Sequence, residues 1–73
     1  MGSFPENLKI CRKRRNLSQE VVAVNCKIAS GTYRRYEKGE REPNLSTLCT
    51  FADYFGVTLD QLAGRVPLPD QET

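Results

Sequence analysis

The segment from Thr32 to Lys38 holds the side chains best suited to contact another molecule. At about 100° per residue, a helix would place Tyr33, Tyr36 and Glu37 on one side. The opposite side would carry Gly31, Arg34, Arg35 and Lys38. Arginine presents a planar fork of N–H donors that matches phosphate groups and the O6 and N7 atoms of guanine. The pattern therefore predicts a helix with an aromatic face toward a core and a cationic face toward an anionic partner.

The sequence contains no comparable pattern for a catalytic site or a metal site. Histidine is absent, which excludes Ser-His-Asp and Cys-His nucleophilic sites and histidine-containing metal sites. Cys11, Cys26 and Cys49 lie 15 and 23 residues apart, a spacing that matches neither a Cys-x-x-Cys redox motif nor paired zinc half-sites. We expect the three thiols to be buried core residues. The sequence predicts no enzyme, no metal site and no cofactor.

Length and charge define the class of protein further. The 73 residues, 38% of them hydrophobic, allow one small domain. Residues 1–43 carry ten Lys and Arg against five Glu, a balance of +5, whereas residues 44–73 carry one Arg against four acidic residues, a balance of −3. The formal net charge of +2 therefore hides a polarised chain. No signal peptide or membrane span is evident, so we expect a cytoplasmic protein that does not enter a membrane.

Capping and stop signals divide the chain into five predicted helices. The expected starts are at Ser3, Ser18, Ser30, Asn44 and Thr58, and the expected stops are at Asn16, Lys27, Gly39, Gly56 and Gly64. The fourth helix carries a stripe with the spacing of a core-facing helix, formed by Leu45, Leu48, Phe51, Ala52 and Phe55. We expect a folded domain over residues 4–63 and a flexible tail or linker stub over residues 64–73.

The run Arg12-Lys13-Arg14-Arg15 lies at the end of the first predicted helix. Cations there interact favourably with the helix dipole, so a solvated helix end explains the run without any function. A functional cationic surface is the alternative.

Two short helices joined by a tight turn, the second with outward cations, have the form that places a helix in the major groove of DNA. Here the sequence resembles the helix-turn-helix domains of phage repressors and Cro, the XRE family. The resemblance runs without a gap from about Leu8 to Leu62. It is carried by Leu17-Ser18-Gln19-Glu20, Ala23, Ile28, Thr32, Arg35-Tyr36-Glu37-Lys38-Gly39-Glu40-Arg41, Pro43, Leu45, Leu48, Ala52, Gly56-Val57 and Leu59-Asp60-Gln61-Leu62.

The resemblance implies an all-α, compact five-helix bundle of the lambda-repressor-like kind, with the helix-turn-helix motif at residues 19–38. It implies a sequence-specific DNA-binding transcriptional regulator, a repressor. Phosphate contacts would come from Ser18, Gln19, Lys38, Arg41 and Asn44. Contacts toward bases would come from Ser30, Gly31, Arg34 and Arg35. Thr32 is a further expected DNA-binding residue. Arg12 and Glu37 match a pair that ties the first helix to the third in this family, and two unrelated surface charges are the alternative reading.

The sequence departs from the family pattern near the turn. Lys27 stands where glycine is usual, so either Lys27 adopts a left-handed conformation at a cost of about 1 kcal/mol or the turn is remodelled. Tyr33 replaces a small aliphatic residue, which suggests altered packing or a phenol edge at the rim. Ala29 is a poor N-cap, so we expect Ser30 to take over that role. Gly31 lacks a base-reading side chain, which shifts specificity to Ser30, Arg34 and Arg35.

The expected partner is double-stranded operator DNA, which calls for a homodimer because one short recognition helix reads only a few base pairs. Apolar residues at the opposite end form a candidate dimer surface: Tyr54, Val57, Leu62, Val66 and Leu68. The alternative for Val57 and Leu62 is that they are simply core residues. A regulatory protein or a C-terminal domain outside these residues is a further possible partner. The alternative function is an antitoxin or another protein-interaction module with the same fold.

Overall fold

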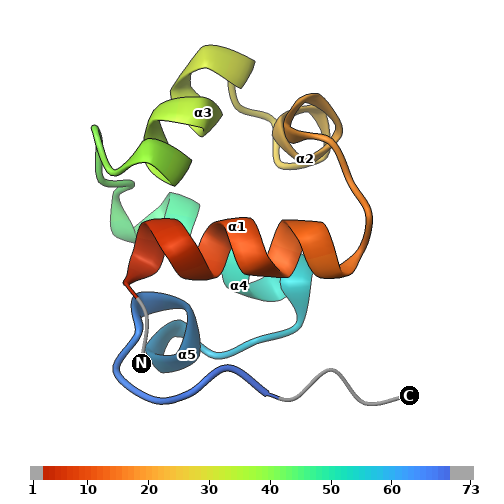
Figure 1. Ribbon diagram of the computed structural model, residues 1–73. Coiled ribbons are helices and arrows are strands. Elements are labelled where there is room, and N and C mark those ends of the chain that lie inside the picture. The colour runs from red at the N-terminus through yellow and green to blue at the C-terminus, as the bar shows by residue number, and fades with distance from the viewer. Residues whose placement is uncertain (1–2, 70–73) are drawn as a thin grey trace.

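Five helices make up the part of the chain that the structure, a computed structural model, describes, which is residues 3–69 (Figure 1). They are α1 (Phe4–Arg14), α2 (Gln19–Asn25), α3 (Ser30–Lys38), α4 (Leu45–Phe55) and α5 (Leu59–Ala63). No strand occurs within residues 3–69. The predicted all-α class with five helices is confirmed.

Three of the predicted helix starts, those of α2, α4 and α5, are made by side chains that satisfy free backbone N–H groups. The Ser18 hydroxyl accepts from the amide of Val21, 3.1 Å away, and Asn44 Oδ1 accepts from the amide of Thr47 at 2.9 Å. Thr58 forms the predicted capping box, because its hydroxyl accepts from the Gln61 amide and the Gln61 side chain accepts from the Thr58 amide. These local bonds explain why the boundaries could be read from the sequence.

Helix α1 crosses the middle of the molecule and holds the other helices together. In Figure 1, α2 and α3 lie above α1, α4 passes behind it, and α5 lies below it. Helix α1 contacts α3, α4 and α5, and α2 packs mainly on α3. The helix-turn-helix pair is therefore held by α1 and by the core beneath α3.

That core is centred on Phe51 of α4, which is fully buried. The rings of Tyr33 and Tyr36 from α3 both meet the Phe51 ring edge-on, with centroid separations of 5.8 Å. Phe4 of α1 adds a third aromatic contact at 6.4 Å. The aromatic face predicted for the third helix is thus the face that anchors α3 in the core.

Some predicted core positions are more exposed than expected. Leu45 is 68% exposed, so its assignment to the core-facing stripe was wrong. It is the first residue of α4, and packing against the core begins one turn later at Leu48. Cys11 and Cys26 are buried as predicted, whereas Cys49 is only half-buried.

One buried polar residue was not anticipated from the sequence. Asn7 of α1 is 4% exposed, and its Nδ2 donates to the backbone oxygens of Gln61 at 3.0 Å and Leu62 at 3.4 Å. Carbonyls in the last turn of a helix lack partners within that helix. Asn7 therefore ties α1 to the C-terminal end of α5.

The segment after α5 runs back along the domain. Leu68 packs against the core, and Arg14 Nη1 donates to the backbone oxygen of Pro69 at 2.7 Å. The remainder of the expected tail, residues 70–73, lies outside the described residues.

The candidate dimer surface overlaps this chain's own core. Leu62 is fully buried, as the core alternative expects, and Tyr54, Val57 and Leu68 are half-buried and pack against the core. Val66 is 40% exposed.

The turn between α2 and α3 keeps its usual form despite the absence of glycine. Lys27 adopts the left-handed conformation with φ of 62°, which settles the alternatives left open by the sequence. The Ile28 amide bonds to the Ala23 oxygen at 3.0 Å and the Lys27 amide to the Val24 oxygen at 3.1 Å, the two bonds of a Schellman motif. Ala29 then takes the N-cap position without a side-chain bond, and Ser30 begins the helix instead of capping it, contrary to our expectation.

We predict that Lys27→Gly raises the free energy of unfolding by about 0.5–1 kcal/mol. Glycine removes the steric cost of a positive φ, and the larger entropy of the unfolded chain offsets part of that gain. Urea denaturation measures the change. Lys9→Gly is the matched control: Lys9 is exposed inside α1, and the same substitution there should destabilise by about 1 kcal/mol. Equal losses at both positions would contradict the prediction.

Candidate nucleic-acid interface

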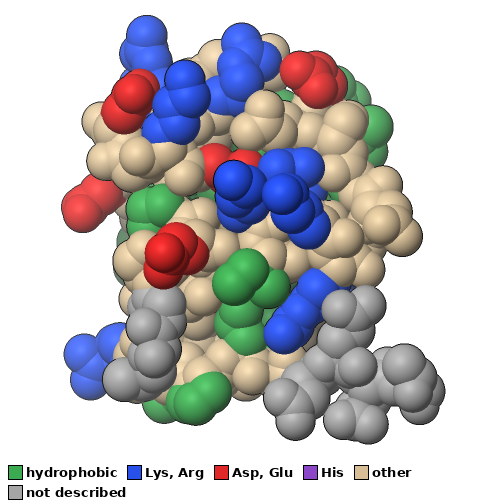
Figure 2. All heavy atoms as spheres, in the orientation of Figure 1, with side chains coloured by type: hydrophobic (Ala, Val, Ile, Leu, Met, Phe, Trp, Pro, Cys, Tyr) green, Lys and Arg blue, Asp and Glu red, His purple; other side chains and the backbone are tan. Residues whose placement is uncertain are grey.

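The cationic face of α3 is directed away from the core. Tyr33 and Tyr36 are buried, and the exposed residues of the helix are Gly31, Arg34, Arg35 and Lys38. Figure 2 shows Lys and Arg side chains gathered over α3 and over the middle of α1. The division into two faces matches the one expected from the residue spacing.

The cations of this face differ in their partners. Arg34 Nη1 lies 3.4 Å from Glu20 Oε2 of α2, and both side chains are largely exposed. Within the described residues, Arg35 and Lys38 have no acidic partner. Arg35 is therefore an exposed arginine without an ion pair in this part of the chain.

Glu37, on the inner side of α3, accepts hydrogen bonds from all three helices around it. Arg12 of α1 donates from Nε to Oε2 at 2.7 Å and from Nη2 to Oε1 at 3.1 Å. Gln19 Nε2 of α2 donates to Oε1 at 3.0 Å, and the Tyr33 hydroxyl donates to Oε2 at 2.5 Å. The Glu37 side chain is 3% exposed and that of Arg12 12% exposed. The structure thus brings Arg12 and Glu37 together as a buried, bidentate ion pair.

This network explains two residues that the sequence left ambiguous. Tyr33 is fully buried, and its hydroxyl reaches Glu37 rather than the rim of the domain. Gln19, expected on a phosphate, has its amide nitrogen engaged with Glu37. Arg12 also donates from Nη1 to the backbone oxygen of Leu17 at 3.0 Å, which fixes the connection into α2.

Burial by itself disfavours the charged form of Glu37, and the hydrogen bonds from Arg12, Tyr33 and Gln19 outweigh that effect, so the pKa of the carboxyl lies below its usual value. Burial and the bond to Glu37 raise the pKa of the Tyr33 phenol. The bond to Glu37 raises the pKa of Arg12 against the opposing effect of burial. All three shifts keep the network in one protonation state at neutral pH.

The remaining predicted site residues lie around α3. Ser18 and Asn44 are exposed and cap α2 and α4. Ser30 and Thr32 are half-buried in the first turn of α3. A Cβ atom added at Gly31 would meet no heavy atom within 4 Å, so open space surrounds this position.

Two cations that sequence reasoning did not assign to the site lie beside it. Lys9 and Lys13 of α1 line a groove of about 450 Å³ together with Ser18 and Lys38, and the Arg12–Glu37 pair lines the same groove. The i, i+4 spacing of Lys9 and Lys13 places them on one face of α1, which is the signal that could have revealed them.

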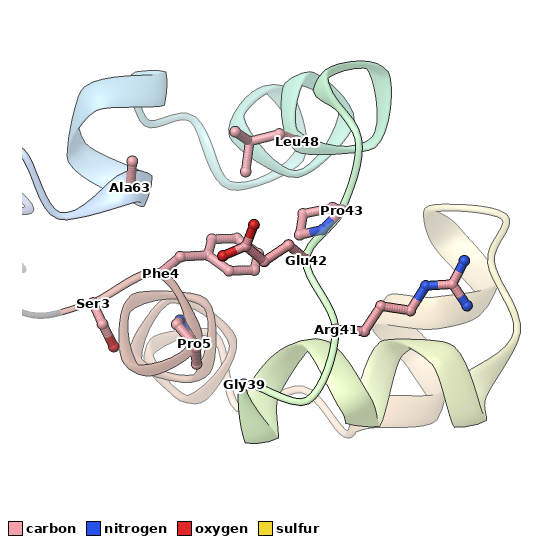
Figure 3. Close-up of a pocket in the computed structure, with 9 residues that line it drawn as sticks. All are labelled: Ser3, Phe4, Pro5, Gly39, Arg41, Glu42, Pro43, Leu48 and Ala63. Atoms are coloured by element: carbon pink, nitrogen blue, oxygen red, sulfur yellow. The ribbon is translucent and has the colours of Figure 1, made fainter.

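A second cavity, of about 430 Å³, lies between the start of α1, the loop after α3, and helices α4 and α5 (Figure 3). Phe4, Pro43 and Leu48 converge there, whereas the Arg41 side chain points away from the cavity. Arg41 is exposed, so its charge is available outside the cavity.

These features define a helix-turn-helix domain whose second motif helix carries an outward cationic face. The helix-turn-helix family matches residues 8–62 of the chain, and the chain belongs to this family, of the XRE type. The recognition of the family from sequence motifs is confirmed.

Several known proteins are similar to the chain. It is 42% identical over 59 residues to the uncharacterized HTH-type transcriptional regulator YqaE of Bacillus subtilis, an alignment that covers 81% of this chain and 51% of that protein. It is 36% identical over 59 residues to the cryptic phage CTXphi transcriptional repressor RstR of Vibrio cholerae, an alignment that covers 81% of this chain and 53% of RstR. The crystal structure of a transcriptional regulator from Listeria innocua matches with a TM-score of 0.82 and 28% identity, over 96% of this chain and 65% of that one.

The chain spans about half the length of the curated relatives it matches. No helix within residues 3–69 is long and apolar enough to cross a membrane. The same residues contain no group of three or more His, Cys, Asp or Glu side chains that could hold a metal ion.

We predict that Glu37→Gln lowers the free energy of unfolding by about 3 kcal/mol at pH 7, because Arg12 is left as a buried charge without its counter-ion. The native pKa of Glu37 lies below the unfolded value of about 4.5, so its stabilisation is complete above that pH and is lost as the pH falls through the native pKa. The difference from wild type should therefore narrow below about pH 4.5.

Chemical denaturation across the acidic range measures that difference. Glu42→Gln, at an exposed position, is the control and should cost little at any pH. A Glu37→Gln deficit that stays constant down to the lowest pH would show that the carboxylate charge is not what stabilises the three helices.

Proposed function

We propose that residues 4–63 form a sequence-specific DNA-binding domain of a transcriptional regulator, with α3 inserted into the major groove. The observation that carries the proposal is the division of α3: two tyrosines anchor it on Phe51, and unpaired Arg35 stands on its exposed face. A rigidly held helix with an outward arginine can present that arginine to a base edge with little loss of entropy.

Phosphate contacts set the register of such a helix on DNA. We assign them to Ser18, Gln19, Lys38, Arg41 and Asn44, and add Lys9 and Lys13. The groove lined by Lys9, Lys13 and Lys38 supports the addition, because three lysines from α1 and α3 can meet one DNA strand there. Each phosphate contact contributes salt-dependent affinity without reading the sequence.

Base contacts fall to the exposed side of α3 and its first turn. We assign them to Ser30, Gly31, Thr32, Arg34 and Arg35. The open space around Gly31 supports a close approach of the helix backbone to the floor of the groove. Arg35 offers a bidentate contact to guanine O6 and N7.

The functional unit in this proposal is a homodimer on a palindromic operator, because two half-sites double the sequence that is read. With Leu62 buried, the exposed apolar side chains at the α5 end are Leu59 and Val66, and we place the dimer contact there. The similarity to RstR, which is named a repressor, supports repression as the effect on transcription. Such a protein acts in the cytoplasm, on the nucleoid.

Selection of bound duplexes from a random-sequence DNA pool tests this function directly. We predict enrichment of a two-fold symmetric consensus with half-sites about one helical turn apart, as two copies of α3 require. Analytical ultracentrifugation of the protein with the selected duplex should give two chains per DNA. A pool with no enrichment would contradict DNA recognition and favour the protein-interaction alternative.

We predict that Arg35→Ala weakens binding to the selected duplex by about 10- to 100-fold, the value of a bidentate guanine contact, and binding to random DNA far less. Fluorescence anisotropy on both duplexes measures the two losses. Lys13→Ala is the matched control: it removes one exposed cation assigned to phosphate and should weaken both complexes equally. An equal loss on both duplexes for Arg35→Ala would refute base reading by Arg35.

A further inference from the structure

Glu20 is an acidic residue beside a surface that is otherwise built from cations. It lies in the first turn of α2, next to Ser18 and Gln19, and its side chain is 64% exposed. A carboxylate at this place repels phosphate groups and so weakens any complex in which the motif approaches DNA. A favourable effect of Glu20 elsewhere would have to offset this loss of affinity.

Helix α2 by itself offers one reason for the residue, because an acidic side chain in the first turn interacts favourably with the helix dipole. Asp60 serves that purpose in α5, at the same second position after the cap. Glu20 has a further contact that the dipole does not explain: its Oε2 lies 3.4 Å from Nη1 of Arg34, across the turn of the motif.

The contact restricts one of two neighbouring arginines. Arg35 has no acidic partner within residues 3–69, whereas the Arg34 guanidinium is drawn toward α2. Occupation of Nη1 by Glu20 leaves the edge formed by Nε and Nη2, which still has the spacing for a bidentate contact to guanine. Without the contact to Glu20, the Arg34 guanidinium would also be free to bind nearby phosphates.

We propose that Glu20 is a positioning residue that raises sequence specificity through Arg34. This inference rests on the proposed DNA-binding function. Glu20 holds Arg34 away from the phosphate backbone, which lowers affinity for random DNA, and directs its free edge toward base edges. Glu20 acts by weakening complexes with random DNA more than the complex with the specific site.

The test is the salt dependence of binding to short duplexes of random sequence. In Glu20→Gln, Arg34 is released and can neutralise one further phosphate. The slope of log K against log salt should become more negative by about 0.9, with binding about five- to tenfold tighter near 0.1 M salt. Affinity for the selected duplex should rise less, so the specificity ratio falls.

Two controls separate this mechanism from a simple change of charge. In the Arg34→Ala background, Glu20→Gln should leave the slope unchanged, because no arginine remains to be released. Asp60→Asn removes the same charge from the same position of α5, and should also leave the slope unchanged. Asp60 is as exposed as Glu20, at 64%, and its Oδ1 lies 3.3 Å from Arg65 Nε.

A steeper slope in the Arg34→Ala background, or an equal change in Asp60→Asn, would overturn the inference and reduce Glu20 to a general electrostatic effect. If wild type binds random DNA and Glu20→Gln shows the same slope, the inference fails while the proposed function stands. Failure of wild type to bind DNA at low salt would contradict both. Because Glu20 is exposed and Gln keeps its shape, we expect the variant to fold, which circular dichroism verifies.

Discussion

The buried carboxylate of Glu37 is the constraint on which the arrangement of the motif depends. An ionised carboxylate excluded from water must have its lone pairs satisfied, and here it accepts from Arg12 of α1, Gln19 of α2 and Tyr33 of α3. Each donor comes from a different helix, so the geometry of the carboxylate fixes three helices relative to one another. A shift of any of them would leave a buried charge or donor without its partner, and that cost limits the motif to one arrangement.

The orientation of α3 follows from this constraint together with the aromatic core. Glu37 and Tyr33 lie on the inner side of the helix, and Phe51 receives the rings of Tyr33 and Tyr36. With that side fixed, Arg34 and Arg35 can only face outward. Tyr33, which stands where a small aliphatic residue is usual, contributes to both the core and the network. Its ring packs in the core, and its hydroxyl completes the hydrogen bonding of Glu37. The surface that could bind DNA is thus set by what is buried behind it.

The positions of the individual charges on this surface say more about binding than the net charge does. Cations from α1 and α3 line one groove, and Glu20 stands at the edge of the same surface, within reach of Arg34. Long-range attraction to a polyanion depends on the sum of these charges, whereas discrimination depends on which of them are free to move.

The five helices, the caps at Ser18, Asn44 and Thr58, the two faces of α3 and the family could all be predicted from the sequence, because capping bonds and helical periodicity act between residues a few positions apart. The cap of α3 is the exception, since Ala29 takes the place expected for Ser30. The sequence also located Lys27 as the one departure in the turn. Tertiary structure decided what could not be read from local spacing. In the run from Arg12 to Arg15, similar side chains make different contacts. Arg12 is buried against Glu37, and Lys13 lines the groove. Arg14 bonds to Pro69, and Arg15 lies over the rings of Tyr54 and Phe55. Glu37 lies 25 residues from Arg12 along the chain and Pro69 lies 55 residues from Arg14, and only the folded backbone brings these pairs within reach.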